Sequence, residues 1–112
     1  IINGFSDWPP FAFETANAIV NTSVLTPRVD DVACYMNFSR RTLQRRLRDI
    51  NLSFSKIVME TRVRIAATWL MNSELTMAEV GFISGFSDQP HFNRTFKSLI
   101  GISPKHYHKF IS

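Results

Sequence analysis

Residues 77–97, MAEVGFISGFSDQPHFNRTFK, predict two short helices joined by a tight turn. Gly85 is expected to end the first helix, because glycine adopts positive φ without steric cost. Ser87 or Asp88 can cap the next helix, and Pro90 suits its first turn. The stretch therefore predicts a helix-turn-helix unit.

The second helix of this stretch has two chemically different faces. At helical spacing, Phe92, Phe96 and Leu99 share the face that is expected to be buried. The opposite face is expected to hold Gln89, Pro90, Asn93, Arg94 and Lys97, so it carries two amides and two cations. Such a polar face backed by an apolar one is what a helix needs to contact base edges in the major groove of DNA.

The same design occurs earlier in the chain. Equivalent residues lie 48 positions apart up to the start of the second helix and 49 apart after it, because the second copy has one extra residue. The matched pairs include Ala33 with Gly81, Asn37 with Gly85, Phe38 with Phe86, Leu43 with Phe92, Arg45 with Arg94, Leu47 with Phe96, and Arg48 with Lys97. This ordered series predicts two helix-turn-helix units.

Positive charge is concentrated on the second helix of the first unit. The whole chain has a formal net charge of +4, and residues 39–49 alone hold five Arg and one Asp. One face of this helix is expected to carry Arg41, Gln44, Arg45 and Arg48, while Arg40 and Arg46 lie at its flanks. The flanking arginines could contact phosphates or lie over the edge of the core. A concentrated positive surface suits a polyanion such as nucleic acid, although a solvated helix face would have the same composition.

Several of these residues resemble the signature of the AraC/XylS family of bacterial transcription regulators. The similar positions are Gly85-Phe86-Ser87-Asp88, Phe92, Arg94, Phe96-Lys97, Gly101, Ser103-Pro104 and Tyr107, together with residues 41–47 in the first unit. The resemblance covers roughly residues 28–110. The sequence departs from the pattern at Asn37 and Asn51, where glycine is usual, and at His108, where arginine is usual.

The resemblance implies a sequence-specific domain that binds double-stranded DNA with two recognition helices in successive major grooves. It implies that the base-facing positions are Arg41, Gln44, Arg45, Gln89, Pro90, His91 and Arg94. Pro90 and His91 also suit an alternative role in packing and in the turn, without contact to a base. Adding Arg40, Arg48, Asn93 and Lys97 completes the predicted contact set. RNA polymerase is an expected partner, and a sensor or dimerisation domain is expected N-terminal to this chain, which starts Ile-Ile-Asn and so suggests a fragment.

The predicted fold is all-α, with about seven helices. The expected divisions are a lead-in and first helix (1–27), a first helix-turn-helix (28–53), a linker helix (54–72), and a second helix-turn-helix with a C-terminal helix (73–112). The linker helix is expected to be a rigid rod about 27 Å long. The buried set is expected to include Phe13, Val20, Cys34, Trp69, Tyr107 and Phe110.

Other classes of function fit less well. No nucleophile lies beside a plausible base, and the single cysteine and the spacing of His106 and His108 do not suit a metal site, so no enzyme activity, cofactor or metal is expected. The chief alternative is a helical protein-interaction module without DNA binding. An RNA binder is disfavoured because the phenylalanines lie at core spacing. No membrane span or signal peptide is visible, so a cytoplasmic, nucleoid-associated protein is expected.

Overall fold

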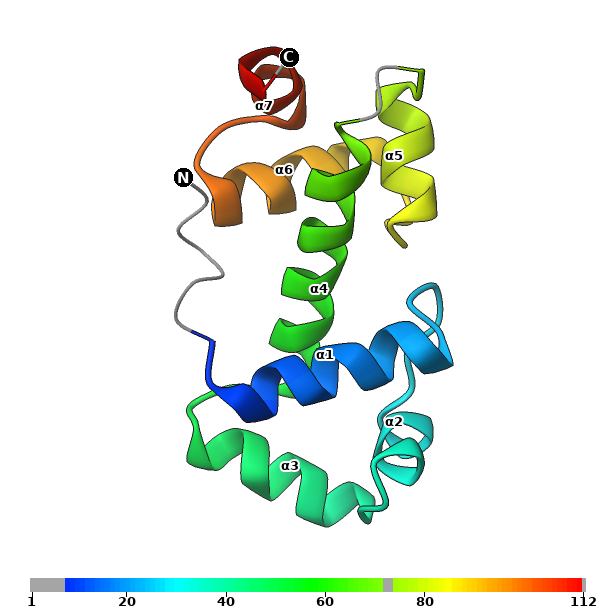
Figure 1. Ribbon diagram of the computed structural model, residues 1–112, viewed down its shortest axis with the longest axis vertical. Coiled ribbons are helices and arrows are strands. Elements are labelled where there is room, and N and C mark those ends of the chain that lie inside the picture. Colours follow the sequence, from blue (N-terminus) through cyan, green and yellow to red (C-terminus); the bar gives the residue numbers. More distant parts are fainter. Residues whose placement is uncertain (1–7, 72–73, 112) are drawn as a thin grey trace. The chain divides into compact units, whose positions relative to one another are not determined.

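The computed structural model describes residues 8–71 and 74–111, and its regular structure is entirely helical over these residues. Seven helices follow one another in the described chain, labelled α1 to α7 (Figure 1). Their bounds are Pro10–Thr22, Val29–Tyr35, Arg40–Asp49, Phe54–Trp69, Met77–Ile83, Gln89–Ile100 and Pro104–Ile111. The predicted all-α fold, with two helix-turn-helix units and a long helix between them in sequence, is confirmed.

The chain divides into two compact units within α4, between Thr61 and Arg62. The N-terminal unit contains α1, α2, α3 and the first part of α4. The C-terminal unit contains the rest of α4 with α5, α6 and α7. In each unit we call the first helix of the helix-turn-helix (α2 or α5) the scaffold helix and the second (α3 or α6) the recognition helix.

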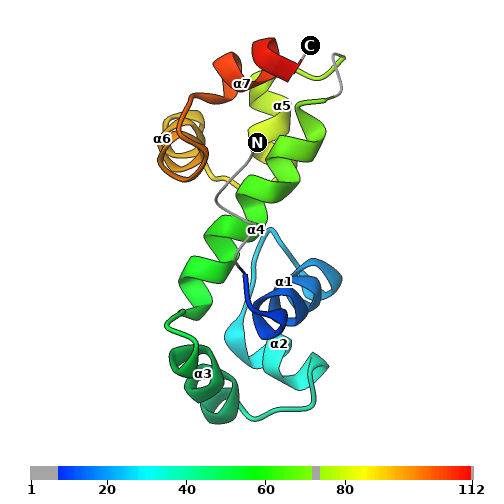
Figure 2. The same cartoon turned by 60° about the vertical axis from the view of Figure 1, so that its left-hand side comes forward.

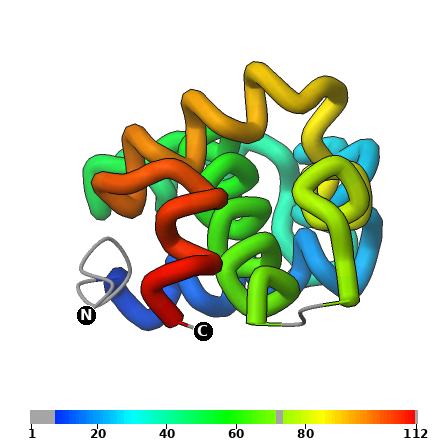
Figure 3. Tube along the Cα trace, turned by 90° about the horizontal axis from the view of Figure 1, so that it is seen from above, coloured from blue at the N-terminus to red at the C-terminus, as the bar shows by residue number. Residues whose placement is uncertain are grey.

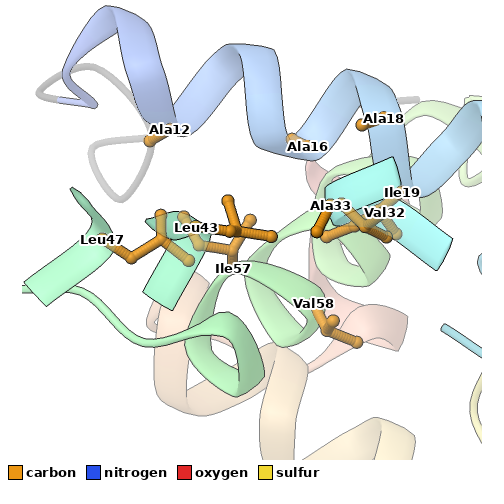
Figure 4. Packing of buried hydrophobic residues seen from close by; sticks show 10 residues of the cluster. All are labelled: Ala12, Ala16, Ala18, Ile19, Val32, Ala33, Leu43, Leu47, Ile57 and Val58. Atoms are coloured by element: carbon orange, nitrogen blue, oxygen red, sulfur yellow. The ribbon is translucent and has the colours of Figure 1, made fainter. Parts of the chain in front are cut away.

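The core of the N-terminal unit draws small and branched side chains from all four of its helical segments (Figure 4). Ile19 from α1, Leu43 from α3 and Ile57 from α4 are fully buried in it. The turn between α2 and α3, visible in Figure 2, passes through Asn37 at φ 63°. Asn51 follows α3 at φ 61°. Asparagine tolerates this left-handed conformation, which explains how it can stand at two positions where the pattern that the sequence resembles usually has glycine.

The core of the C-terminal unit is built around a chain of aromatic rings. Phe86, Phe92, Phe96 and Tyr107 contact one another in sequence order, with centroid distances of 5.1, 5.8 and 5.4 Å. The contact between Phe96 and Tyr107 holds α7 against α6. Figure 3 shows the trace of these two helices. Edge-on and tilted rings at such distances add stability beyond the area they bury.

Some residues expected in the core are exposed instead. α1 buries Ala12, Thr15, Ala16 and Ile19, so Phe13 and Val20 lie beside this stripe, and Val20 is 52% exposed. α2 buries Val32 and Ala33, which turns the neighbouring Cys34 outward. Trp69, in the last turn of α4, is also exposed.

The C-terminal helix behaves in part as expected. Tyr107 is buried, but Phe110 lies in the last turn of α7 and is 70% exposed. The predicted closure of the linker helix at residues 72 and 73 lies outside the described residues.

Candidate nucleic-acid interface

The first recognition helix is fixed at its start and along its buried face. The Ser39 side chain accepts a hydrogen bond from the backbone N–H of Thr42 at 3.1 Å, which satisfies one of the free donors at the helix N-terminus. Leu43 and Leu47 are fully buried one turn apart. Together, the cap and these two leucines determine the rotation of α3, so its polar face must point outward.

That outward face is strongly basic. All five predicted contact residues on α3 have exposed side chains, namely Arg40, Arg41, Gln44, Arg45 and Arg48. Arginine offers a planar fork of donors that fits guanine O6 and N7 or a phosphate, and glutamine can pair with adenine. The face can therefore contact both base edges and the backbone.

Two arginines of α3 are engaged within the protein. Arg40 pairs with Asp30 of the scaffold helix, Nε to Oδ1, at 3.5 Å, and both side chains are largely solvent-exposed. The guanidinium of Arg46 lies over the rings of Phe11 and Phe38. Of the two expected roles for Arg46, the structure thus favours lying over the core edge.

The second scaffold helix begins with a capping box and ends at a glycine turn. The Thr76 side chain accepts from the N–H of Glu79 at 3.1 Å, and the Glu79 carboxylate accepts from the N–H of Thr76 at 2.8 Å, as predicted. Gly85 then adopts φ 97°, a conformation that disfavours side chains. Asp88, rather than Ser87, caps α6 by accepting from the N–H of His91 at 2.8 Å.

The predicted contact residues of α6 are not all equally accessible. Pro90, Asn93, Arg94 and Lys97 are exposed, whereas Gln89 and His91 are half-buried. The His91 ring packs edge-on against Phe86, with 5.5 Å between centroids. Of its two expected roles, this geometry favours packing at the turn.

A groove runs along the exposed face of α6 within the C-terminal unit. Its walls bring together three cations, Arg94 and Lys97 from α6 and Lys105 from α7. Ser103 accepts from the N–H of His106 at 3.2 Å and so caps α7 beside the groove. Lys105 was not among the residues predicted to contact DNA. Its position directly after Ser103-Pro104, at the start of a helix, was the available signal.

No helix in the described ranges is both long and apolar enough to cross a membrane.

Comparison with known proteins gives a consistent result. A family model described as a helix-turn-helix domain matches residues 32–109. The Msm operon regulatory protein of Streptococcus mutans is 35% identical over 85 residues, covering 75% of this chain and 31% of that protein. The chain spans about a third of the length of the curated relatives it matches first.

Solved structures show the same fold. The crystal structure of a transcriptional regulator from Chromobacterium violaceum, described as containing an AraC-type DNA-binding domain, has a TM-score of 0.79 at 27% identity, covering 89% of this chain and 90% of that one. The DNA-binding domain of the global transcriptional factor AdpA, solved with a target DNA, has a TM-score of 0.71 at 24% identity, covering 88% and 90%.

Proposed function

Because the chain belongs to the family of AraC-type helix-turn-helix domains, we propose that it binds double-stranded DNA sequence-specifically and serves transcription regulation. In this proposal α3 and α6 each enter a major groove, and the two grooves are successive. The observation that carries the proposal is the repeated placement of amides and cations on the exposed face of a capped recognition helix in both units.

Different residues are assigned different tasks. Arg45 and Arg94 occupy equivalent positions in the repeat, each directly after an amide residue, Gln44 or Asn93. These four side chains are exposed and have the donor and acceptor patterns that distinguish guanine and adenine. Arg40, Arg41, Arg48 and Lys97 supply further positive charge on the same helices, and we assign Lys97 to phosphate contact.

The alternative, a protein-interaction module, does not account for the distribution of charge. Such a module would not require cations and amides to gather on the second helix of both units. Support for DNA also comes from a neighbour of the same fold, AdpA, whose structure was solved with its target DNA.

Selection of bound sequences from a random DNA pool by the isolated chain, followed by a protection assay, tests this proposal. We expect a non-palindromic site of about 20 base pairs, bound by one chain, because the two recognition helices differ in sequence. A symmetric palindrome occupied only by two chains would contradict the proposed mode of binding. Failure to enrich any sequence would contradict DNA recognition itself.

The proposal includes RNA polymerase as a partner and a sensor or dimerisation domain elsewhere in the same protein, since both are expected of a regulator in this family. The action on RNA polymerase is tested by transcription in vitro from a promoter carrying the selected site, with and without the chain. An unchanged transcript level would argue against direct action on the polymerase by this part of the regulator.

A further inference from the structure

Gln89, the first residue of α6, points back toward the scaffold helix. Its side chain is half-buried, while Asn93, Arg94 and Lys97 on the same helix are exposed. A Cβ built on Gly81 of α5 would lie 3.5 Å from Gln89 Oε1, an ordinary van der Waals distance. The carboxamide of Gln89 therefore lies against the backbone of α5, where no side chain intervenes.

The other end of the same carboxamide holds a neighbour on the recognition helix. Gln89 Nε2 donates a hydrogen bond to Asn93 Oδ1 at 3.3 Å, one helical turn further on. An amide oxygen has two lone pairs, so Asn93 keeps one lone pair and both Nδ2 hydrogens for other partners. Those are the groups that pair with N6 and N7 of adenine.

The N-terminal unit has a related arrangement at the equivalent positions. In the repeat, Arg40 corresponds to Gln89, and Gln44 corresponds to Asn93. Arg40 also turns toward its scaffold helix, where it pairs with Asp30. In both units the first side chain of the recognition helix thus lies beside the scaffold helix, and the residue one turn later is exposed.

We propose that Gln89 is a positioning residue, which holds the amide of Asn93 in the orientation that pairs with an adenine, and does not itself contact a base. The inference rests on the proposed function and refines it, since Gln89 is among the residues predicted from the sequence to face bases. The physical reason is pre-organisation. A free Asn93 side chain in a helix would distribute over about two χ1 wells and two amide orientations, and one geometry alone makes the bidentate contact.

The first test needs no DNA. The variant Gln89→Met keeps the approximate length of the side chain beside α5 but removes the carboxamide, and with it the donor to Asn93. Side-chain NMR couplings of Asn93 in the free protein should report one dominant χ1 rotamer in the wild type and averaging over several in the variant. Identical Asn93 couplings in both proteins would overturn the proposal, whatever the result of any binding experiment.

The second test separates positioning from direct readout. Binding to the selected site and all its single-base variants is measured for wild type, Gln89→Met, Asn93→Ala and the double variant. We expect Gln89→Met to reduce discrimination by about twofold to fourfold, the loss from freeing the χ1 and the amide orientation of Asn93, and only at the base pair that Asn93 recognises. In the Asn93→Ala background, Gln89→Met should have no further effect.

Lys97→Met, on the same helix, is the matched control. It should weaken binding to every sequence alike and leave the Asn93 rotamer unchanged. Loss of discrimination at a second base pair in Gln89→Met, persisting in the Asn93→Ala background, would show that Gln89 reads its own base and would overturn the positioning role. If wild-type protein preferred no sequence, the proposed function would fail, and the rotamer measurement would still decide whether Gln89 positions Asn93.

Discussion

The guanidinium of Arg46 lies over the ring of Phe11, with its Cζ 4.5 Å from the ring centroid. The same group lies 5.1 Å from the centroid of Phe38, so two aromatic faces at the edge of the core hold it. Its sequence neighbour Arg45 has no such aromatic partner described and is exposed on the recognition face. Adjacent arginines on one helix therefore have different surroundings: Arg46 packs over two aromatic rings, and Arg45 has the exposed position that the proposed base contact requires.

Replacing Arg46 with Ala should lower the free energy of unfolding by about 0.5–2 kcal/mol, because the cation–π contacts and the packing of the aliphatic stem are lost. Urea denaturation measures this change. Arg48→Ala, an exposed change on the same helix, is the control and should stay within about 0.5 kcal/mol of the wild type. Equal stability losses in the two variants would contradict the packing role of Arg46.

Helix ends could be predicted from the sequence because the signals are local. Ser39, the Thr76 and Glu79 pair, and Asp88 each satisfy backbone donors within three residues of themselves. The internal repeat extended these local signals to the architecture, since a second copy made two helix-turn-helix units the simplest account. Of the eleven predicted contact residues, nine are exposed, and the exceptions are Gln89 and His91, which are half-buried.

What could not be predicted depends on contacts between distant parts of the chain. Arg46 meets Phe11 from α1, and no pattern within α3 distinguishes it from Arg45. The half-buried Gln89 carboxamide lies beside Gly81, which belongs to another helix. In α1, where apolar residues are adjacent in sequence, the small Ala12 is fully buried whereas the larger Phe13 is 42% exposed.

Gly81→Ala should destabilise the C-terminal unit. The new Cβ would lie 3.1 Å from Phe92 Cδ2, and the Phe92 ring is fully buried between Phe86 and Phe96 and has little room to move. Overpacking costs about 1–3 kcal/mol, of which better helix propensity returns up to about 1 kcal/mol. Thermal denaturation should show the loss.

The repeat provides the reciprocal control. Ala33 is the counterpart of Gly81 and is buried in the N-terminal unit. Ala33→Gly should be destabilising through lost helix propensity and lost packing. A Gly81→Ala variant more stable than the wild type would mean that the ring of Phe92 can shift without cost.

Alkaline pH should weaken the packing of α7. Burial raises the pKa of Tyr107 above its ordinary value of 10.0, because the phenolate is poorly solvated there. Because the pKa is higher in the folded than in the unfolded state, the packing of the neutral Tyr107 phenol contributes fully to stability below pH 10. This contribution is lost as pH rises through the pKa of the folded state.

The measurement is the free energy of unfolding against pH for the wild type and for Tyr107→Phe. The difference between the two proteins should be constant below pH 10 and should shrink or reverse in favour of Tyr107→Phe above it. A difference that stays constant through the alkaline range would show that Tyr107 ionises equally well in the folded state.

Binding to the selected site should depend strongly on salt. If the cations of α3, α6 and the groove at Lys105 engage about 6–10 phosphates, affinity should fall by about 10³ to 10⁵ between 50 and 200 mM salt. Fluorescence anisotropy with labelled duplex gives this slope, and Lys97→Ala should reduce it by about one. A nearly flat titration would favour the protein-interaction module.

The most direct measurement of the central claim is the binding of Arg45→Ala and Arg94→Ala to the selected site and to every single-base variant of it. Each replacement should cost about 1–3 kcal/mol on the preferred site and relax selectivity at one base pair, different for the two arginines. We expect Arg45→Ala to have the larger effect, because α3 carries more positive charge and no proline. Equal loss of affinity on every sequence for both variants would contradict base recognition by α3 and α6 and would leave them as electrostatic clamps.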